Sequence, residues 1–327
     1  MRLLRSLAAA HAHSGLALAI GNFDGVHLGH QAILADTVAA ARQRGLKPAA
    51  MSFYPLPREL FAHRAGQELP VRLMSVTEKL AAFRHSGLDM AILAHFTPAF
   101  AGQSPMVFLD SLDQARVRWI MVGADFRFGA KRAGDIGWLR REGAARGIEV
   151  HAHSDVAIDR RRVSSTGVRE ALAGGALESA QRMLGRRYAM VGRVLRGRQL
   201  GRTLGFPTAN VALSGRRAAL TGVHAVQCRL IATRGLEGVA GKAGTILNGV
   251  ANLGTNPVVS SENRQHLEVF LFDFSGDLYG RRLEVTFIEK IRDEVKFDGL
   301  EALVRAMHDD AERARTILRT IDDGHQD

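Results

Sequence analysis

The stretch that decides the fold is LALAIGNFDGVHLGH, which occupies residues 16–30. Its first five residues are all apolar, as is typical of a strand that is buried on both faces of a sheet. A turn containing two glycines follows, and from His30 to Arg44 the pattern is helical. These residues therefore predict a strand, a tight turn and a helix, which is the first part of a strand–helix–strand unit.

The same alternation continues through the first half of the chain. We expect strands at residues Leu16–Phe23, Pro48–Phe53, Met90–Leu93, Trp119–Val122 and Ile148–His151. Helical patterns lie between them, as at Thr77–Ser86, which ends at Gly87. The pattern predicts an α/β domain with a doubly wound, mainly parallel sheet, in which ligands bind at the carboxyl ends of the strands.

Two histidines follow the first strand, at positions 27 and 30. Because they are three residues apart at the start of a helix, they should share one helix face. A helix N-terminus binds phosphate, and imidazoles beside it can stabilise charge on a transferring phosphoryl group. Two surface histidines at a turn are the alternative. The H-x-G-H spacing favours the phosphate site and resembles the signature of the nucleotidylyltransferase superfamily.

Two further segments follow strands or begin helices. In Gly123–Gly129, Asp125 falls at a strand end, where it could accept hydrogen bonds from a ring, and Phe126 and Phe128 could pack on an aromatic ligand. These phenylalanines could equally be core residues. In Ser164–Arg169 the hydroxyl residues are typical helix caps, while Arg169 would supply a cation for a triphosphate.

After Gly185 the pattern changes to short strands without intervening helices, followed by a helical pattern from Gly299 to Ile321. This predicts a small antiparallel β-barrel with a closing α-helix. We therefore expect two domains, at residues 1–185 and 186–327.

Two features of the second domain bear on chemistry. Thr208 and Asn210, after a run of glycines and arginines, would present hard oxygen ligands on one face if the chain is extended, as Mg²⁺ prefers beside nucleotide phosphates. A polar turn after Pro207 is the alternative. In the strand 267–274, Glu268 should share a face with three phenylalanines, at positions 270, 272 and 274. Burial there would raise the pKa of Glu268 toward that of a general base, although an ion pair with arginine is equally possible.

Composition bounds the function. The 327 residues carry a formal net charge of +11, which permits a nucleic-acid partner, but the low aromatic content and the glycines among the arginines at 186–217 argue against it. The single cysteine, Cys228, allows no disulfide within the chain and fits a reducing cytoplasm. No apolar run approaches the roughly 20 residues of a membrane helix, and histidines at 11 and 13 argue against a signal peptide.

In order and spacing, Gly21–His30, Gly123–Gly129 and Ser164–Arg169 resemble the adenylyltransferase module of prokaryotic bifunctional riboflavin kinase/FMN adenylyltransferases. Residues 188–315 resemble their riboflavin kinase module, notably at 201–210, 249–254, 268–274, 277–280 and 291–297. The resemblance implies riboflavin, FMN, FAD and ATP as ligands, Mg²⁺ as cofactor, a cytoplasmic location, and no membrane or nucleic-acid partner in a monomer or weak homo-oligomer.

The resemblance also implies site residues. The catalytic ones are His27, His30 and Glu268. The adenylyltransferase would bind nucleotide through Gly21, Phe23, Asp24, Gly25, Gly29, Ser164, Ser165, Thr166 and Arg169, and flavin through Asp125, Phe126 and Phe128. The kinase would bind ATP through Gly197, Gly201, Arg202, Gly205, Pro207, Thr208 and Asn210, with Mg²⁺ on Thr208 and Asn210.

The sequence departs from the family pattern at three places. Leu56 stands where a histidine between two prolines is usual, His224 replaces a tyrosine, and Asn256-Pro257-Val258 replaces Arg-Pro-Thr. Because of Leu56, a chain in which only the kinase module is active is an alternative hypothesis. Two further hypotheses are a flavin- or nucleotide-binding regulator that has lost catalysis and a nucleic-acid-binding protein.

Overall fold

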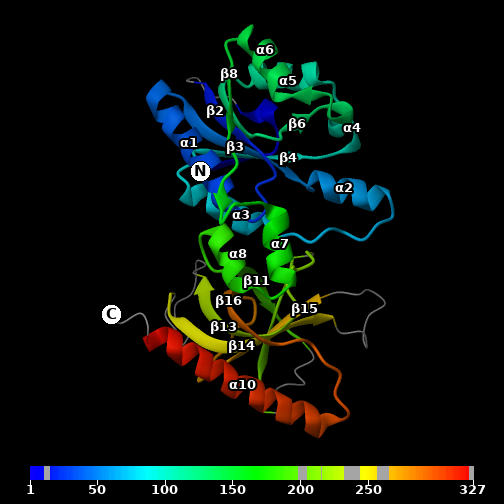
Figure 1. The fold of residues 1–327 in the computed structure, drawn as a ribbon, viewed down its shortest axis with the longest axis vertical. Coiled ribbons are helices and arrows are strands. Elements are labelled where there is room, and N and C mark those ends of the chain that lie inside the picture. Colours follow the sequence, from blue (N-terminus) through cyan, green and yellow to red (C-terminus); the bar gives the residue numbers. More distant parts are fainter. Residues whose placement is uncertain (11–14, 198–204, 215, 232–243, 256–264, 324–327) are drawn as a thin grey trace. The chain divides into compact units, whose positions relative to one another are not determined.

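The computed structural model describes residues 1–10, 15–197, 205–214, 216–231, 244–255 and 265–323. They form two compact units. The first comprises Met1–Pro70 and Val76–Ser165, and the second comprises Val71–Ser75 and Thr166–Asp327. Figure 1 shows the elements of both units.

A six-stranded parallel sheet organises the first unit. In the order β1-β4-β3-β2-β5-β8, its strands are Arg2–Leu4, Met90–His95, Lys47–Tyr54, Leu16–Ile20, Val117–Gly123 and Glu149–His153. All five residues of β2 are buried, as expected for a strand covered on both faces. The expected α/β domain with a parallel sheet is thereby confirmed.

Helices and two short ribbons complete this unit. The helices are α1 (Leu28–Arg44), α2 (Pro57–Arg64), α3 (Val76–His85), α4 (Pro98–Ala101), α5 (Pro105–Gln114) and α6 (Ile136–Ala144), with 3-10 turns at Leu7–Ala9 and Ala130–Arg132. The ribbons pair β6 (Arg127–Phe128) with β7 (Gly134–Asp135) and β9 (Ala157–Ile158) with β10 (Arg161–Arg162).

The order of the strands in the first unit indicates where a ligand would bind. From β2 the chain moves outward to β3 and β4, and then returns to the other side of β2 as β5. The strand order therefore reverses between β2 and β5, which are hydrogen-bonded neighbours. Ligands of open α/β sheets bind at such a reversal, beyond the carboxyl ends of the strands. The segments that follow these two strands are Gly21–His30 and Ala124–Gly129.

The second unit contains a closed six-stranded barrel in the order β11-β12-β15-β14-β13-β16. Its strands in that order are Ala189–Leu195, Thr208–Val211, Gln265–Leu271, Ile246–Thr255, Gly222–Ile231 and Arg282–Arg292. The interstrand pairings are antiparallel, and the barrel interior is filled by small and branched apolar side chains such as Ala209, Val269 and Leu253. This confirms the predicted antiparallel barrel.

In the described part of the second unit, the barrel is accompanied by α7 (Ser165–Ala173), α8 (Leu177–Leu184) and α10 (Leu300–Asp323). Helix α10, red in Figure 1, packs on β13, β14 and β16, and is the predicted closing helix. Its small residues Ala311 and Ala314 lie in an apolar cluster with Phe206 and Phe272. The guanidinium of Arg292 donates to both carboxylate oxygens of the buried Asp310 at 2.7–3.1 Å, which fixes the helix on the last strand.

The strand that carries Glu268 is shorter than expected. β15 ends at Leu271, and Asp273 has a φ of +51°, so the alternation of side chains stops before residue 274. Phe270 and Phe272 pack in the cluster with α10, whereas Phe274 packs against the interior cluster of the barrel. The expectation that Phe274 shares a face with Glu268 was therefore wrong.

His224 is a buried titratable group in this barrel. Its side chain is fully buried, Nδ1 lies 3.1 Å from the Gly222 carbonyl oxygen, and Nε2 has no hydrogen-bond partner among the described residues. Because a carbonyl only accepts, Nδ1 carries the proton of the neutral ring. The pKa of His224 is lowered to about 4, chiefly by burial; the charge of Lys290 also lowers it, while the Gly222 carbonyl and Asp293 raise it.

We expect the barrel to lose stability on mild acidification because of His224. Its pKa in the folded chain is below its ordinary value of 6.5, so between these values the unfolded chain binds more protons. The free energy of unfolding therefore falls as the pH is lowered from 6.5 toward 4. Below pH 4, His224 causes no further fall. Linkage gives about 2 kcal/mol between pH 7 and pH 5. Hydrogen exchange of the β13 amides at both pH values measures it.

The matched control is His224→Phe, which keeps an aromatic ring against Phe287, whose centroid lies 5.3 Å from that of His224. This variant should lose about 2 kcal/mol less than the wild type between the same pH values. An equal loss in both proteins would contradict the prediction.

Candidate active sites

The loop between β2 and α1 brings the two predicted histidines together. His27 caps α1, and its Nδ1 accepts a hydrogen bond from the backbone N–H of His30 at 3.4 Å. The two rings are stacked, with centroids 3.7 Å apart and an interplanar angle of 19°. His27 is buried, whereas His30 is half-buried and lies edge-on to Phe23. The shared helix face expected from the spacing is therefore present.

The loop has a strained backbone. Phe23 and Val26 adopt φ values of +47° and +42°, in a region that costs side chains with a Cβ free energy, especially β-branched ones. Gly25, between them, has a φ of +89° at no such cost. A Cβ at Gly29 would lie 3.4 Å from the ring of His27, an ordinary van der Waals contact, so Gly29 packs beside that ring.

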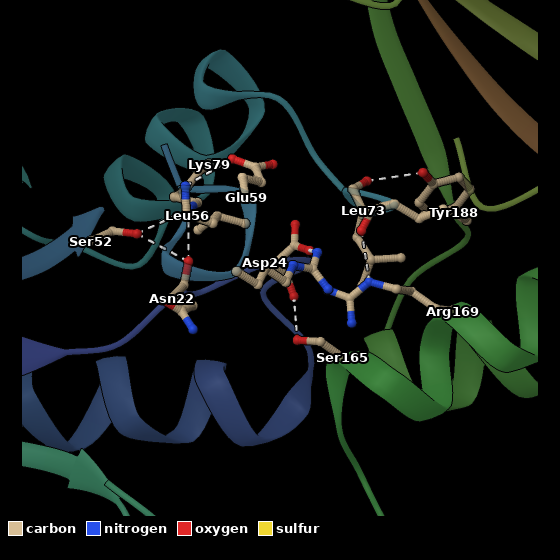
Figure 2. Close-up of polar contacts among 12 residues, drawn as sticks. Asn22, Asp24, Ser52, Leu56, Glu59, Leu73, Lys79, Ser165, Arg169 and Tyr188 are labelled. Atoms are coloured by element: carbon tan, nitrogen blue, oxygen red, sulfur yellow. Dashed lines mark hydrogen bonds and ion pairs between the residues drawn. The ribbon is translucent and has the colours of Figure 1, made fainter. Parts of the chain in front are cut away.

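Hydrogen bonds from other elements hold this backbone. Arg58, on α2, forms an ion pair with the buried carboxylate of Asp24 at 2.8 Å. The Ser165 hydroxyl donates to the Asp24 carbonyl oxygen at 2.8 Å, as Figure 2 shows. The side-chain amide of Gln31 donates to the Val26 carbonyl oxygen at 2.9 Å. A strained loop persists only where such contacts over-determine it.

The N-terminus of α1 suits an anion. Its first N–H groups face the loop, its first turn contains no acidic residue, and the positive end of the helix dipole lies there. Two imidazoles at the same point add donors for oxygens on which charge develops. The arrangement has the features that the sequence predicted for a phosphate site.

Residues 123–129 follow β5, the neighbour of β2. Asp125 is exposed and accepts a hydrogen bond from the guanidinium of Arg162 at 3.0 Å. Phe128 is buried in the core of the sheet, while the half-buried Phe126 stacks on it with a centroid distance of 5.5 Å. Phe126 therefore offers more accessible ring surface than Phe128.

The segment 164–169 is divided between the two compact units. Ser164 and Ser165 belong to the first, where Ser165 binds the Asp24 carbonyl. Thr166 and Arg169 belong to the second, where the Arg169 side chain donates to the Val71 carbonyl oxygen at 3.0 Å.

Leu56 is buried and caps α2 without a side-chain hydrogen bond. Its backbone N–H donates instead to the carboxylate of Glu59 at 2.8 Å. Helix α2 thus begins normally although the expected histidine is absent. Arg58, the second residue of this helix, still forms its ion pair with Asp24.

The barrel aligns three polar side chains across adjacent strands. Asn210 on β12 is paired with Glu268 on β15, and Glu268 is paired with Asn252 on β14. Directly opposed residues of antiparallel strands project on the same face, with Cβ atoms about 5 Å apart. The three form a row on the outer face of the barrel, which also carries Phe270.

Thr208 lies two residues before Asn210 on β12 and therefore on the same face. The turn before it contains Gly205, with a φ of +82°, and Pro207. A Cβ at Gly197 would collide with the side-chain amide of Asn210, so any other residue there would require that amide to move. Gly201 and Arg202, also predicted to bind ATP, lie outside the described residues.

Burial raises the pKa of Glu268, and the charge of His266 acts against this rise. Among the described residues, Glu268 has no ion pair with an arginine. The ion-pair alternative is therefore not found in the described part of the chain, and burial acts on the Glu268 carboxyl in the direction that the sequence predicted.

Three residues of these sites escaped prediction. Lys79 and Arg58 bind the loop after β2, and Asn252 completes the row beside Glu268, with its amide oxygen buried and without a hydrogen-bond partner among the described residues. In sequence, Lys79 and Arg58 look like ordinary charged residues of amphipathic helices. Only Asn252, an amide within an apolar strand, gave a signal.

The chain matches two family models, one described as FAD synthetase over residues 9–167 and one described as riboflavin kinase over residues 184–318. A crystal structure described as a macrolide-efflux protein from Streptococcus pneumoniae has a similar fold, with a TM-score of 0.77 at 26% identity over 96% of this chain and 98% of that one. Among the described residues, no helix is long and apolar enough to cross a membrane.

Three curated relatives are named bifunctional riboflavin kinase/FMN adenylyltransferase. The protein from Haemophilus influenzae is 39% identical over 98% of this chain and 100% of its own length. Those from Pseudomonas fluorescens and Escherichia coli K12 are each 41% identical, over 93% and 88% of this chain and 94% and 88% of their own lengths. On these similarities, which extend over nearly the whole length of each relative, the chain belongs to the family of bifunctional riboflavin kinase/FMN adenylyltransferases.

Proposed function

We propose that this protein makes FAD in two ATP-dependent steps, riboflavin to FMN and FMN to FAD. The observation that carries this function is the pairing of two complete constellations in one chain. Stacked histidines cap a helix at the reversal of a parallel sheet, and a half-buried carboxylate lies between two amides on a barrel.

In the adenylyltransferase step, the triphosphate of ATP binds at the N-terminus of α1. A phosphate oxygen of FMN attacks the α-phosphorus, a new P–O bond forms, and the bond to pyrophosphate breaks. His27 and His30 donate to the oxygens on which negative charge accumulates. Asp125, Phe126 and Phe128 bind the flavin. The remaining nucleotide contacts are those inferred above, namely Gly21, Phe23, Asp24, Gly25, Gly29, Ser164, Ser165, Thr166 and Arg169.

In the kinase step, Glu268 accepts the proton of the riboflavin 5′-hydroxyl as its oxygen attacks the γ-phosphorus of ATP, and ADP leaves. A desolvated carboxylate is a stronger base than one in water, which supports this role. The glycine-rich sequence 197–207, with Thr208 and Asn210, binds ATP.

Thr208 and Asn210 would hold Mg²⁺, since a hydroxyl and an amide oxygen on one strand face are the hard donors that this ion takes beside phosphates. The absence of a Cβ at Gly197 leaves space for the Asn210 amide, which supports a ligand role for it. When bound, Mg²⁺ neutralises charge on the phosphates.

The functional boundary falls between residues 185 and 186, so that the adenylyltransferase domain is 1–185 and the kinase domain 186–327. The protein acts in the cytoplasm, where ATP is present and the buried Cys228 stays reduced. It works as a monomer or weak homo-oligomer and takes neither nucleic acid nor membrane as a partner.

A chromatographic time course tests this function. Purified protein is incubated with riboflavin, ATP and Mg²⁺, and FMN and FAD are quantified. Appearance of FMN followed by FAD is the expected result. FMN alone would show an impaired adenylyltransferase module and make Leu56→His the first variant to examine. Formation of neither product would refute the proposal.

A further inference from the structure

Three elements of the first unit meet at one carbonyl group. The Nζ of Lys79, on α3, donates to the carbonyl oxygen of Asn22 at 2.7 Å and to the hydroxyl of Ser52, on β3, at 2.9 Å. The Ser52 hydroxyl itself donates to the same Asn22 oxygen at 3.0 Å. Figure 2 shows Lys79 and Ser52 converging on Asn22. Lys79 is only 4% exposed and Ser52 is fully buried.

Burying the ammonium group of Lys79 costs free energy. An ammonium group taken out of water loses several kcal/mol of hydration, which hydrogen bonds only partly restore. The hydrogen bonds to the Asn22 carbonyl and to the Ser52 hydroxyl help to keep this ammonium group in place.

The carbonyl that Lys79 holds is a sensitive part of the loop. Asn22 directly precedes Phe23, whose φ is +47°. On the other side of Phe23, Asp24 is held through its carboxylate by Arg58 and through its carbonyl by Ser165. The strained residue is thus fixed from both sides, and the path of the chain to His27 depends on both anchors.

We propose that Lys79, together with Ser52, is a positioning residue of adenylyl transfer. By fixing the Asn22 carbonyl it sets the loop so that His27 and the first N–H groups of α1 meet the phosphates in the reactive geometry. The inference rests on the proposed role of this loop in binding ATP. Lys79 itself touches neither ATP nor FMN in this proposal.

The test is Lys79→Met in the full chain, with Lys47→Met as matched control, since Lys47 is exposed and only forms a 3.8 Å ion pair with Asp89. FAD formation is measured from FMN and ATP, and FMN formation from riboflavin serves as internal standard. Lys79→Met should lower kcat for FAD about 100-fold, the cost of a reactive group misplaced by about 1 Å. The KM for ATP should change little, because ground-state contacts remain. Lys47→Met and FMN formation should match the wild type.

Folding is monitored in the same samples. Both tryptophans of the chain, Trp119 and Trp138, lie in the first unit, so their emission reports its integrity alone. Lys79→Gln, which keeps an N–H donor, should recover part of kcat. A merely structural role would leave kcat unchanged at native emission, and that result overturns the proposal.

If Lys79→Met does not fold, the proposal is tested with Ser52→Ala, which removes one hydrogen-bond donor to Asn22 and one acceptor for Lys79. A lowered kcat for FAD at native emission supports the proposal, and an unchanged kcat overturns it. A wild-type chain that makes no FAD at all would instead refute the function on which the inference rests.

Discussion

Glu268→Gln should lower the rate of FMN formation from riboflavin by about 1000-fold, within the range that a general base contributes. Glutamine fills the same volume on β15 and keeps the pairing with Asn210 and Asn252, but it accepts no proton. The loss should appear in kcat, with the KM for ATP little changed, because the proton moves only in the transition state. Initial rates of FMN formation measure the effect.

Two controls accompany this variant. Glu289→Gln makes the same exchange at an exposed position of β16 and should leave FMN formation unchanged. FAD formation from supplied FMN depends on the first unit and should be normal in both variants. A Glu268→Gln chain that retains more than about a tenth of its kinase rate would exclude Glu268 as the base.

His27→Ala should lower FAD formation from FMN by about 100- to 1000-fold, as expected when a donor to developing charge is removed. Kinase activity should be unaffected, since its residues lie in the other unit. The measurement is the initial rate of FAD formation at saturating FMN and ATP, followed by chromatography.

His27 also caps α1, so its removal has a structural component of about 1 kcal/mol. His27→Asn separates the two roles, because asparagine is a good cap but lacks the imidazole. It should be as inactive as His27→Ala while its tryptophan emission stays native. His85→Ala, at an exposed position on α3, is the matched control. Full activity of His27→Asn would assign His27 a capping role only.

Much of the fold could be predicted because its signals are local. The apolar run at 16–20 forms β2, and the helical pattern after it forms α1. The edge strand β1 escaped prediction because three residues, Arg2–Leu4, carry no periodicity, and only pairing with β4 makes them a strand.

The candidate sites divide in the same way. His27 and His30 could be placed together because a helix fixes the relation of residues three apart. The row of side chains across the barrel strands could not be predicted, since strand register depends on which strands become neighbours. Asn252 lies beside Glu268 only because β14 pairs with β15, and Phe274 leaves that face only because β15 ends at Leu271.

By itself the sequence determined the family and the two fold classes, because motifs and periodicities are written in neighbouring residues. The tertiary structure alone decided that Lys79 is buried against Asn22 and that Arg58 reaches Asp24. Whether a charged helix residue faces water or a loop depends on elements far away in the chain, and no local pattern records their packing.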